Sequence, residues 1–343
     1  MKLNVGIIGA TGEVGRMMLK VMEEKNFPVN ELRLYASPKS KGKKIIFKNK
    51  AYYVENLNEA SFSGLDLVFG AVSNELALKY AKAIVNAGAI FIDNSSAFRM
   101  NDDVPLVVPE INMKDAFKTS GIIANPNCST IITLTGINAI NKLSKIKSMV
   151  VTTFQAVSGA GQYGIMELVD ENERITHITK TTGNTNPKID KKYDVFAHQI
   201  ASNVIPQISS FLDNGYTKEE MKMQNEGRKI LHNDELLVDC TCVRVPVIRS
   251  HSISVDLITE DELDIEDIKD KLLVTDGVIL CDDPEELEYP MPILTSDQDL
   301  VYVGRIRKSL INKNGISLFV SGDQIRKGAA TNAIDIAIKY FKI

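Results

Sequence analysis

The fold of this chain follows from one stretch, Gly9-Ala10-Thr11-Gly12-Glu13-Val14-Gly15. It comes directly after a buried strand expected over residues 3–8 and opens a helix expected over 13–25, the context that the dinucleotide-binding glycine fingerprint requires. The first glycine allows a tight turn, the second lets the backbone approach a pyrophosphate, and the third lets the helix pack closely on the strand. Since a helix N-terminus also stabilises phosphates, a dinucleotide site is favoured over a glycine turn without a ligand.

The first ninety residues alternate between two periods. Strand patterns lie at 32–36, 65–71 and 89–93, and a helical pattern lies at 75–87. In the first helix, one face carries Val14, Met17, Met18, Val21 and Met22. This alternation is typical of βαβ units and predicts an α/β protein whose N-terminal domain is a Rossmann-type parallel sheet.

The loop after the second strand indicates which dinucleotide is bound. An NAD site usually presents an acid to the ribose about twenty residues beyond the glycines. Here the loop carries Ser37, Lys39 and Ser40 and no acid. Hydroxyl and ammonium groups suit a 2′-phosphate, so NADP is expected rather than NAD, although a solvated turn has a similar composition.

A second informative stretch is Asn125-Pro126-Asn127-Cys128-Ser129-Thr130. It joins a short strand at 121–124 to a helix that begins by residue 131, which places Cys128 near a helix N-terminus. Unpaired N–H groups and the helix dipole stabilise a thiolate there, so a nucleophile is expected rather than a structural cysteine. Cys240 and Cys242 alternate on an expected strand without further zinc ligands, so we interpret them as core or site-lining residues and expect no metal site.

Composition narrows the class of protein. The chain has 343 residues, a net charge of -4 and 44% hydrophobic residues, values that are ordinary for a soluble globular protein of two domains. The charge offers no footprint for nucleic acid or an anionic membrane. No apolar run reaches the roughly 20 residues that span a bilayer, and the N-terminus enters a strand directly, so a cytoplasmic location is expected.

Eight motifs in sequence order resemble the aspartate-β-semialdehyde dehydrogenases and cover nearly the whole chain. Besides the two stretches above, they are Ser95-Ser96-Ala97-Phe98-Arg99, Val108-Pro109-Glu110-Ile111-Asn112, Gln155-Ala156-Val157-Ser158-Gly159-Ala160-Gly161, Glu219-Glu220-Met221-Lys222, Arg244-Val245-Pro246-Val247-Ile248-Arg249-Ser250-His251 and Asp323-Gln324-Ile325-Arg326-Lys327-Gly328-Ala329-Ala330. Two departures concern the cofactor: Lys39 stands where many members carry arginine, and Gln324 where many carry asparagine.

The resemblance implies the NADPH-dependent, reversible conversion of 4-phospho-L-aspartate to L-aspartate-4-semialdehyde and phosphate, a step of lysine, threonine and methionine biosynthesis. Cys128 would form a thioester, His251 would be the acid/base residue and Gln155 would orient the substrate. For substrate and phosphate binding, the resemblance implies Arg99, Asn127, Glu219, Lys222 and Arg244. For cofactor binding, it implies Gly9, Ala10, Thr11, Gly12, Glu13, Val14, Ser37, Lys39, Ser40, Ser158, Gly159 and Gln324.

Within that set, Arg244 would clamp the α-carboxylate through a bidentate fork, which lysine cannot reproduce. Glu219 would meet the amino group, and Lys222 with Arg99 would meet the phosphate. Without the resemblance, a surface ion pair would explain Glu219 and Lys222, because they are three residues apart on a helix expected over 217–231.

The expected architecture has two domains. Residues 1–127, joined by a C-terminal helix within 323–343, form the NADP-binding domain, and residues 128–322 form an α+β catalytic and dimerisation domain. Its strands are expected at 150–157, 236–247, 252–258, 301–309 and 316–321, in a largely antiparallel sheet with helices on one face. Because such broad sheets commonly bury one face in a symmetric partner, a homodimer is expected.

Three alternatives remain. N-acetyl-γ-glutamyl-phosphate reductase shares the fold and the cysteine chemistry, but its substrate has no free amino group for Glu219 to bind. Glyceraldehyde-3-phosphate dehydrogenase would normally show an acid after the second strand. A dinucleotide-binding redox sensor would use Cys128 as a switch without turnover.

Overall fold

The computed structural model describes residues 1–57, 62–190 and 194–343, which divide into two compact units. Unit 1 consists of Met1–Ile131, Asn225–Asp234 and Ile325–Ile343, and unit 2 of Ile132–Gln224 and Glu235–Gln324. Residues 225–234, from the middle of the predicted second domain, thus group with the first unit. The domain boundaries expected after residues 127 and 322 stay a prediction.

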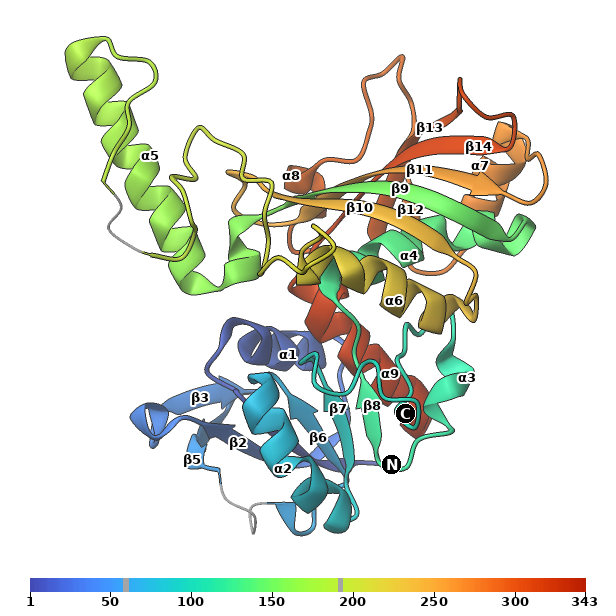
Figure 1. Cartoon of the computed structure of the whole chain (residues 1–343). Coiled ribbons are helices and arrows are strands. Elements are labelled where there is room, and N and C mark those ends of the chain that lie inside the picture. Colours follow the sequence, from blue (N-terminus) through green and yellow to red (C-terminus); the bar gives the residue numbers. More distant parts are fainter. Residues whose placement is uncertain (58–61, 191–193) are drawn as a thin grey trace. The chain divides into compact units, whose positions relative to one another are not determined.

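Unit 1 is built on a six-stranded sheet in which every neighbouring pair is parallel. In spatial order its strands are β5 (Glu55–Asn56), β2 (Val29–Ala36), β1 (Leu3–Ile8), β6 (Leu67–Gly70), β7 (Ile90–Asp93) and β8 (Ile122–Ala124). A separate hairpin pairs β3 (Lys44–Phe47) with β4 (Lys50–Tyr53). The predicted Rossmann-type sheet is therefore confirmed (Figure 1).

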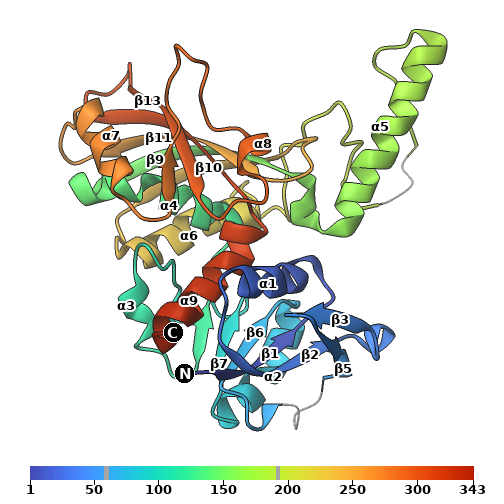
Figure 2. The same ribbon diagram turned by 180° about the vertical axis from the view of Figure 1, so that it is seen from behind.

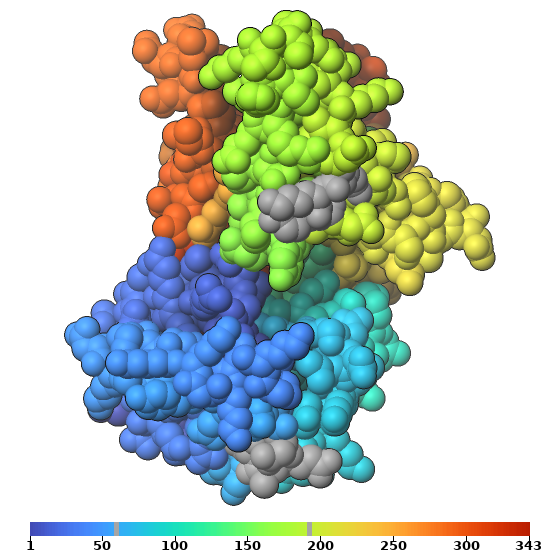
Figure 3. Space-filling model, turned by 90° about the vertical axis from the view of Figure 1, so that its left-hand side faces the viewer, coloured from blue at the N-terminus to red at the C-terminus, as the bar shows by residue number. Residues whose placement is uncertain are grey.

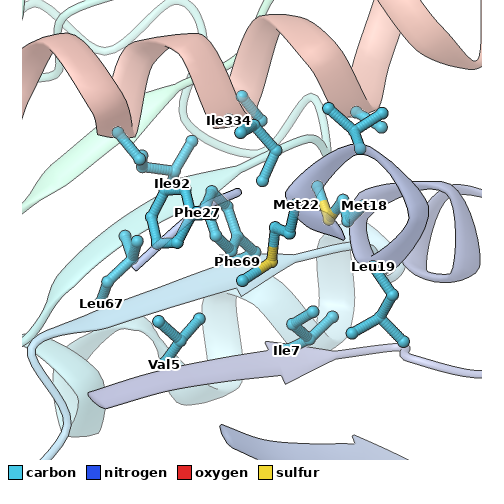
Figure 4. Close-up of a cluster of buried hydrophobic side chains, with 14 of the residues drawn as sticks. Val5, Ile7, Met18, Leu19, Met22, Phe27, Leu67, Phe69, Ile92 and Ile334 are labelled. Carbon is cyan, nitrogen blue, oxygen red and sulfur yellow. The ribbon is translucent and has the colours of Figure 1, made fainter. Parts of the chain in front are cut away.

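The core of unit 1 lies between this sheet and two helices, α1 (Glu13–Glu24) and α9 (Thr331–Phe341). Figure 4 shows Met18 and Met22 of α1 and Ile334 of α9 directed at the strand residues beneath them. Of the five residues predicted to face inward from α1, four are buried and Val14 is partly buried. Burying such an apolar stripe is what fixes an amphipathic helix on a sheet. The remaining helices are α2 (Asn74–Asn86), α3 (Met113–Ala116) and the short 3₁₀ turn η1 (Pro38–Ser40).

The C-terminal helix differs from the single helix expected over 326–341. It starts as a π-helical turn, η4 (Arg326–Ala330), and becomes α-helical only at Thr331. Gly328 lies in this turn, where a Cβ would come within 2.9 Å of the Cys128 Cβ. Since π-turns widen a helix locally and occur often at functional sites, we attribute the irregular start to this close approach.

Unit 2 is built on a six-stranded mixed sheet. Its spatial order is β10 (Leu237–Arg244), β9 (Ile146–Gln155), β11 (His251–Thr259), β14 (Gly315–Gly322), β13 (Val301–Lys308) and β12 (Val278–Leu280). The β9–β10 and β12–β13 pairs are parallel and the three central pairs are antiparallel. Helix α4 (Cys128–Leu143) lies along one face, where Gly136 approaches Val320 and Val303 closely (Figure 1).

A long helix of unit 2, α5 (Gln162–Thr182), follows the 3₁₀ turn η3 (Val157–Ala160) and was not predicted. It stands away from the sheet of its unit in Figures 1 and 2, and Figure 3 shows its outer face in green. Two buried carboxylates tie it to the chain that follows: Glu167 accepts the N–H of Val195, and Glu171 accepts those of Ile200 and Ala201.

The other helices are α6 (Lys218–Leu231), α7 (Ile265–Leu273) and α8 (Pro292–Thr295). Within the described ranges, no helix combines the length and apolar character needed to cross a membrane.

Candidate active site

The predicted site residues are divided between the two units. Unit 1 carries the glycine loop, the 37–40 loop, Arg99, Asn127 and Cys128. Unit 2 carries Gln155, Ser158, Gly159, Glu219, Lys222, Arg244, His251 and Gln324. Each half is described on its own.

The glycine loop of unit 1 has the geometry of a phosphate site. Gly9 has φ +87°, and a Cβ there would meet the carbonyl oxygen of Ala71 at 2.1 Å. A Cβ on Gly15 would meet the Gly9 oxygen at 2.3 Å, so both positions require glycine for steric reasons. Gly12 is different: its nearest neighbour would be the Gly9 oxygen at 3.3 Å, and no side chain caps the N-terminus of α1. The open side of Gly12 and the uncapped helix fit a dinucleotide pyrophosphate.

The loop that follows β2 brings hydroxyl groups to the glycine loop. Ser40 is buried, and its Oγ accepts a hydrogen bond from the Oγ1 of Thr11 at 3.4 Å. Lys39 is exposed on the short turn η1, and Ser37, also exposed, comes directly before that turn. A cation and hydroxyls at the end of the second strand suit a phosphate on the ribose.

Cys128 is the first residue of α4, as predicted. The side chain of Asn127 caps this helix, because its Oδ1 accepts the N–H groups of Ser129 at 3.0 Å and Thr130 at 3.3 Å. Asn127 therefore has a helix-capping contact in addition to the substrate role predicted for it. The cysteine is partly exposed, and Gly328 of η4 packs against it.

Arg99 is almost fully buried and held from three directions. Its Nε donates to the carbonyl oxygen of Asn125 at 2.9 Å, its Nη2 to that of Asn94 at 2.8 Å, and its Nη1 to Oε1 of Glu226 at 3.0 Å. The other oxygen of Glu226 accepts the N–H of Asn127 at 2.7 Å. One carboxylate of α6 thus contacts both the arginine and the chain beside the cysteine.

In unit 2, three predicted residues meet at one end of the sheet. Gln155 ends β9, Arg244 ends β10 beside it in register, and His251 begins β11. The Arg244 side chain is buried, donates from Nη1 to the carbonyl oxygen of Ala156 at 2.5 Å, and lies with its guanidinium carbon 5.6 Å from the ring centroid of Phe196. Such a cation–π contact fixes the plane of the guanidinium.

His251 is fully buried. Burial, reinforced by the positive charge of Arg244, lowers the pKa of His251 to about 3. Its Nδ1 accepts the N–H of Ala156 at 3.1 Å, so the neutral ring carries its proton on Nε2. The Nε2 atom lies 3.4 Å from the amide nitrogen of Gln155. The ring is therefore held neutral and oriented.

Glu219 and Lys222 form an ion pair on one face of α6, with Nζ and Oε2 2.7 Å apart. Glu219 also lies 3.4 Å from the amide nitrogen of Gln155, which donates to its Oε1. Gln155 in turn accepts a hydrogen bond from Thr153 at 3.0 Å. The predicted carboxylate, amide and ammonium groups are thus in contact within unit 2.

The predicted cofactor residues of unit 2 pack against the same side chains. A Cβ on Gly159 would lie 3.0 Å from Nη1 of Arg244 and 3.3 Å from Cε1 of His251. Gln324 donates from Nε2 to the hydroxyl of Ser158 and accepts the N–H of Ser250 at 2.9 Å. These contacts bring Ser158, Gly159 and Gln324 to the end of the sheet that carries His251.

Sequence reasoning missed Glu226, Lys229 and Phe196. Lys229 donates to the carbonyl oxygens of Arg99, Asn101 and Val104, at 2.6 to 2.9 Å. A signal for the first two was present, because positions 219, 222, 226 and 229 repeat at helical spacing. Phe196 gave no such signal.

The other cysteines lie outside the predicted site. Cys240 and Cys242 are buried on β10 with their sulfurs 3.8 Å apart, so they are core residues. Among the residues that the structure describes, no group of three or more metal-ligating side chains is arranged to hold a metal ion.

Comparison with known proteins agrees with this geometry. The family model described as semialdehyde dehydrogenase, NAD binding domain, matches residues 4–119, and the model of the semialdehyde dehydrogenase dimerisation domain matches residues 137–327. The aspartate-semialdehyde dehydrogenase of Aquifex aeolicus is 49% identical over 98% of this chain and 97% of its own length, and that of Bacillus subtilis is 44% identical over 98% and 96%.

A solved structure is also similar to this chain over its whole length. The crystal structure of aspartate semialdehyde dehydrogenase II from Vibrio cholerae has a TM-score of 0.94 and 41% identity, and the match covers 100% of this chain and 99% of that one. A second crystal structure of that protein is described as complexed with ASA.

Proposed function

The chain belongs to the aspartate-semialdehyde dehydrogenase family, and we propose that it reduces 4-phospho-L-aspartate to L-aspartate-4-semialdehyde with NADPH, through a thioester on Cys128. One observation carries the proposal: Cys128 opens α4 in the unit that also holds the glycine loop and Arg99. Full-length relatives of this family favour it over the reductase of N-acetyl-γ-glutamyl phosphate and over a sensor without turnover.

The first step forms a bond between the Cys128 sulfur and the acyl carbon, while the bond from that carbon to the phosphate oxygen breaks. The positive end of the α4 dipole stabilises the thiolate, and the guanidinium of Arg99 with the ammonium of Lys222 binds the departing phosphate. The fork of Arg244 holds the α-carboxylate, and Glu219 binds the amino group.

NADPH supplies a hydride to the thioester carbon when it is bound. The oxygen on that carbon then carries negative charge, and the Nε2–H of neutral His251 donates a hydrogen bond to it. Collapse of this oxyanion restores the carbonyl and breaks the carbon–sulfur bond, which releases the aldehyde and regenerates the Cys128 thiolate. In the reverse direction, the same Nε2–H stabilises the oxyanion that forms when the Cys128 thiolate adds to the aldehyde.

The covalent mechanism is tested in the oxidative direction. Enzyme mixed with semialdehyde and NADP in phosphate-free buffer should give a burst of NADPH no larger than the concentration of active sites, and added phosphate should restore turnover. Cys128→Ala should abolish the burst and keep NADP binding, because the glycine loop is a separate element. Steady turnover without phosphate would contradict the proposal.

Preference for NADP over NAD rests on Ser37, Lys39 and Ser40. We expect a higher kcat/KM with NADP, and Lys39→Ala should narrow the difference because one cation facing the 2′-phosphate is removed. Lys50→Ala, which removes an exposed lysine on β4 outside the predicted cofactor set, is the control. Equal efficiency with both cofactors in the unmodified enzyme would overturn this choice.

We further propose a homodimer that forms through unit 2, whose matching family model is described as a dimerisation domain. Val150 of β9 and Leu237 of β10 are exposed apolar side chains on adjacent strands of its sheet. Pairing this face with a second copy would bury both. Analytical ultracentrifugation should give twice the chain mass, and Leu237→Lys should weaken association.

A further inference from the structure

Glu226 is a deeply buried carboxylate in contact with two proposed site residues of unit 1. Only 2% of its side chain is exposed, and it lies on α6, far along the chain from the residues it contacts. Its two oxygens are used separately: Oε1 accepts from Nη1 of Arg99, and Oε2 accepts the N–H of Asn127.

On the arginine side, the contact completes the orientation of the guanidinium. Carbonyl oxygens of Asn94 and Asn125 accept from two of its nitrogens, and Glu226 accepts from the third. Because a guanidinium is planar, three contacts in three directions fix both its plane and its rotation in that plane. Glu226 is the one partner of the three that also supplies a countercharge.

On the cysteine side, the contact holds the peptide immediately before the nucleophile. Asn127 donates its N–H to Glu226 and accepts two N–H groups of α4 through its side chain. The start of the helix, and with it the direction of the Cys128 side chain, depends on where this peptide lies.

A second anchor on the same helix supports the first. Lys229, three residues further, donates to three carbonyl oxygens of the chain from Arg99 to Val104. The chain from Arg99 to Val104 is thus tied to α6. Lys229 reaches only the arginine segment, whereas Glu226 reaches the arginine and the cysteine segments together.

We propose that Glu226 is a positioning residue that sets the distance and orientation between the phosphate-binding Arg99 and the nucleophile Cys128. This rests on the proposed function, which assigns the roles of those two residues. In an acyl phosphate, a single oxygen joins the phosphate to the reacting carbon. The arginine that binds the phosphate and the cysteine that attacks the carbon must therefore be held at a fixed distance from each other. A carboxylate that contacts both supplies that constraint.

The chemistry of the side chain makes the role testable. Glutamine has the same shape but only one acceptor oxygen, so Glu226→Gln must face either Arg99 or the Asn127 N–H with an amide donor. Aspartate keeps both oxygens and the charge but is one methylene shorter. Glu171→Gln is a matched control, because Glu171 is also a buried carboxylate that accepts two peptide N–H groups, and it lies in unit 2 on α5.

The first measurement is steady-state kinetics with phosphate varied. Glu226→Gln should raise the KM for phosphate about tenfold and lower kcat, as loss of an oriented, charge-assisted contact would. Glu226→Asp should also raise this KM, and Glu171→Gln should leave it unchanged. A folded Glu226→Gln or Glu226→Asp enzyme with the unmodified KM would overturn the proposal.

The second measurement uses no substrate, so it separates this proposal from the proposed function. Alkylation of Cys128 by iodoacetamide is followed against pH, with the other cysteines replaced by alanine. Removing a negative charge beside the start of α4 should shift the midpoint to lower pH in Glu226→Gln, with no shift in Glu226→Asp or Glu171→Gln. An unchanged midpoint in Glu226→Gln would overturn the link to Cys128, whereas an unmodified enzyme that turns over without phosphate would refute only the proposed function.

Discussion

The predicted site residues fall into two halves, one in each unit, and the halves use different parts of the polypeptide. In unit 1, the candidate ligand groups are the peptide N–H groups at the start of α1, whose N-terminus no side chain caps, together with the buried side chain of Arg99. In unit 2, they are buried side chains, above all Arg244, His251 and Glu219. The first half should therefore be sensitive to added atoms, and the second to changes of charge, fork geometry and pH.

The largest effect is expected at Arg244. Arg244→Lys keeps the charge but loses the planar fork, so kcat/KM for the semialdehyde should fall by about 3 kcal/mol in transition-state free energy. Folding, followed by thermal denaturation, should change much less. Arg307→Lys, a change at an exposed arginine of β13, serves as the control for a general effect of exchanging cations in unit 2. Near-normal kcat/KM in Arg244→Lys would contradict the proposal that Arg244 binds the α-carboxylate. It would also remove the difference expected between the two units.

His251 should make stability depend on pH. Its pKa is about 3 in the folded protein, whereas an unfolded histidine has a pKa near 6.5. Below pH 6.5 the unfolded state binds a proton that the folded state does not. The free energy of unfolding should therefore decrease by about 2 kcal/mol as the pH is lowered from 6.5 to 5.

Urea denaturation at the two pH values measures this component. It should disappear in His251→Asn and persist in His232→Asn, because His232 is exposed. A loss of stability that is the same in all three proteins would show that His251 titrates normally.

The glycine loop allows the complementary test in unit 1. Gly12 has φ -75°, which alanine adopts, and a Cβ there would meet only one protein atom, at 3.3 Å. Gly12→Ala should therefore weaken NADP binding about tenfold while leaving the melting temperature nearly unchanged. Gly15→Ala should lower both, because its Cβ would overlap the Gly9 oxygen. Titration calorimetry and thermal denaturation distinguish the two. An unchanged affinity for NADP in Gly12→Ala would mean that the pyrophosphate does not approach the backbone at Gly12.

The smallest effect is expected at Phe196, whose ring lies under Arg244. Phe196→Leu retains an apolar side chain and removes the cation–π contact, so kcat/KM should fall by about 1 kcal/mol in transition-state free energy. Phe211→Leu, a change at an exposed aromatic residue of unit 2, is the control. An equal response in both variants would show that the ring does not orient the arginine.

Sequence patterns predicted most of the parallel sheet because its central strands and the helix α1 bury apolar runs. The strand at 3–8, the glycine turn and the inward face of α1 all follow from local spacing. Helix α5 escaped prediction because its buried positions include Glu167 and Glu171, which read as surface charges. Strand β12 has three residues, too few for a periodic pattern.

The same distinction applies to the site. Cys128 and the Glu219–Lys222 pair were predictable because the neighbours that matter are close in sequence. Helical spacing could have placed Glu226 on the face of Glu219 and Lys222, but Glu226 is 127 residues from Arg99 and Phe196 is 48 residues from Arg244, so no local pattern identifies the partner in either contact. The π-helical turn was also missed, because it reflects packing of Gly328 on Cys128 rather than the composition of its own segment.

The buried cysteines of β10 can serve as probes of local unfolding. Cys240 and Cys242 lie on a strand at the edge of its sheet and are shielded from water, whereas Cys128 is partly exposed. A thiol reagent can modify the buried pair only when this edge strand detaches, so its rate there reports the frequency of that opening. Time-resolved mass spectrometry of the intact chain would then measure two rates in one experiment: the reactivity of Cys128, and the opening of β10, the strand that ends in Arg244.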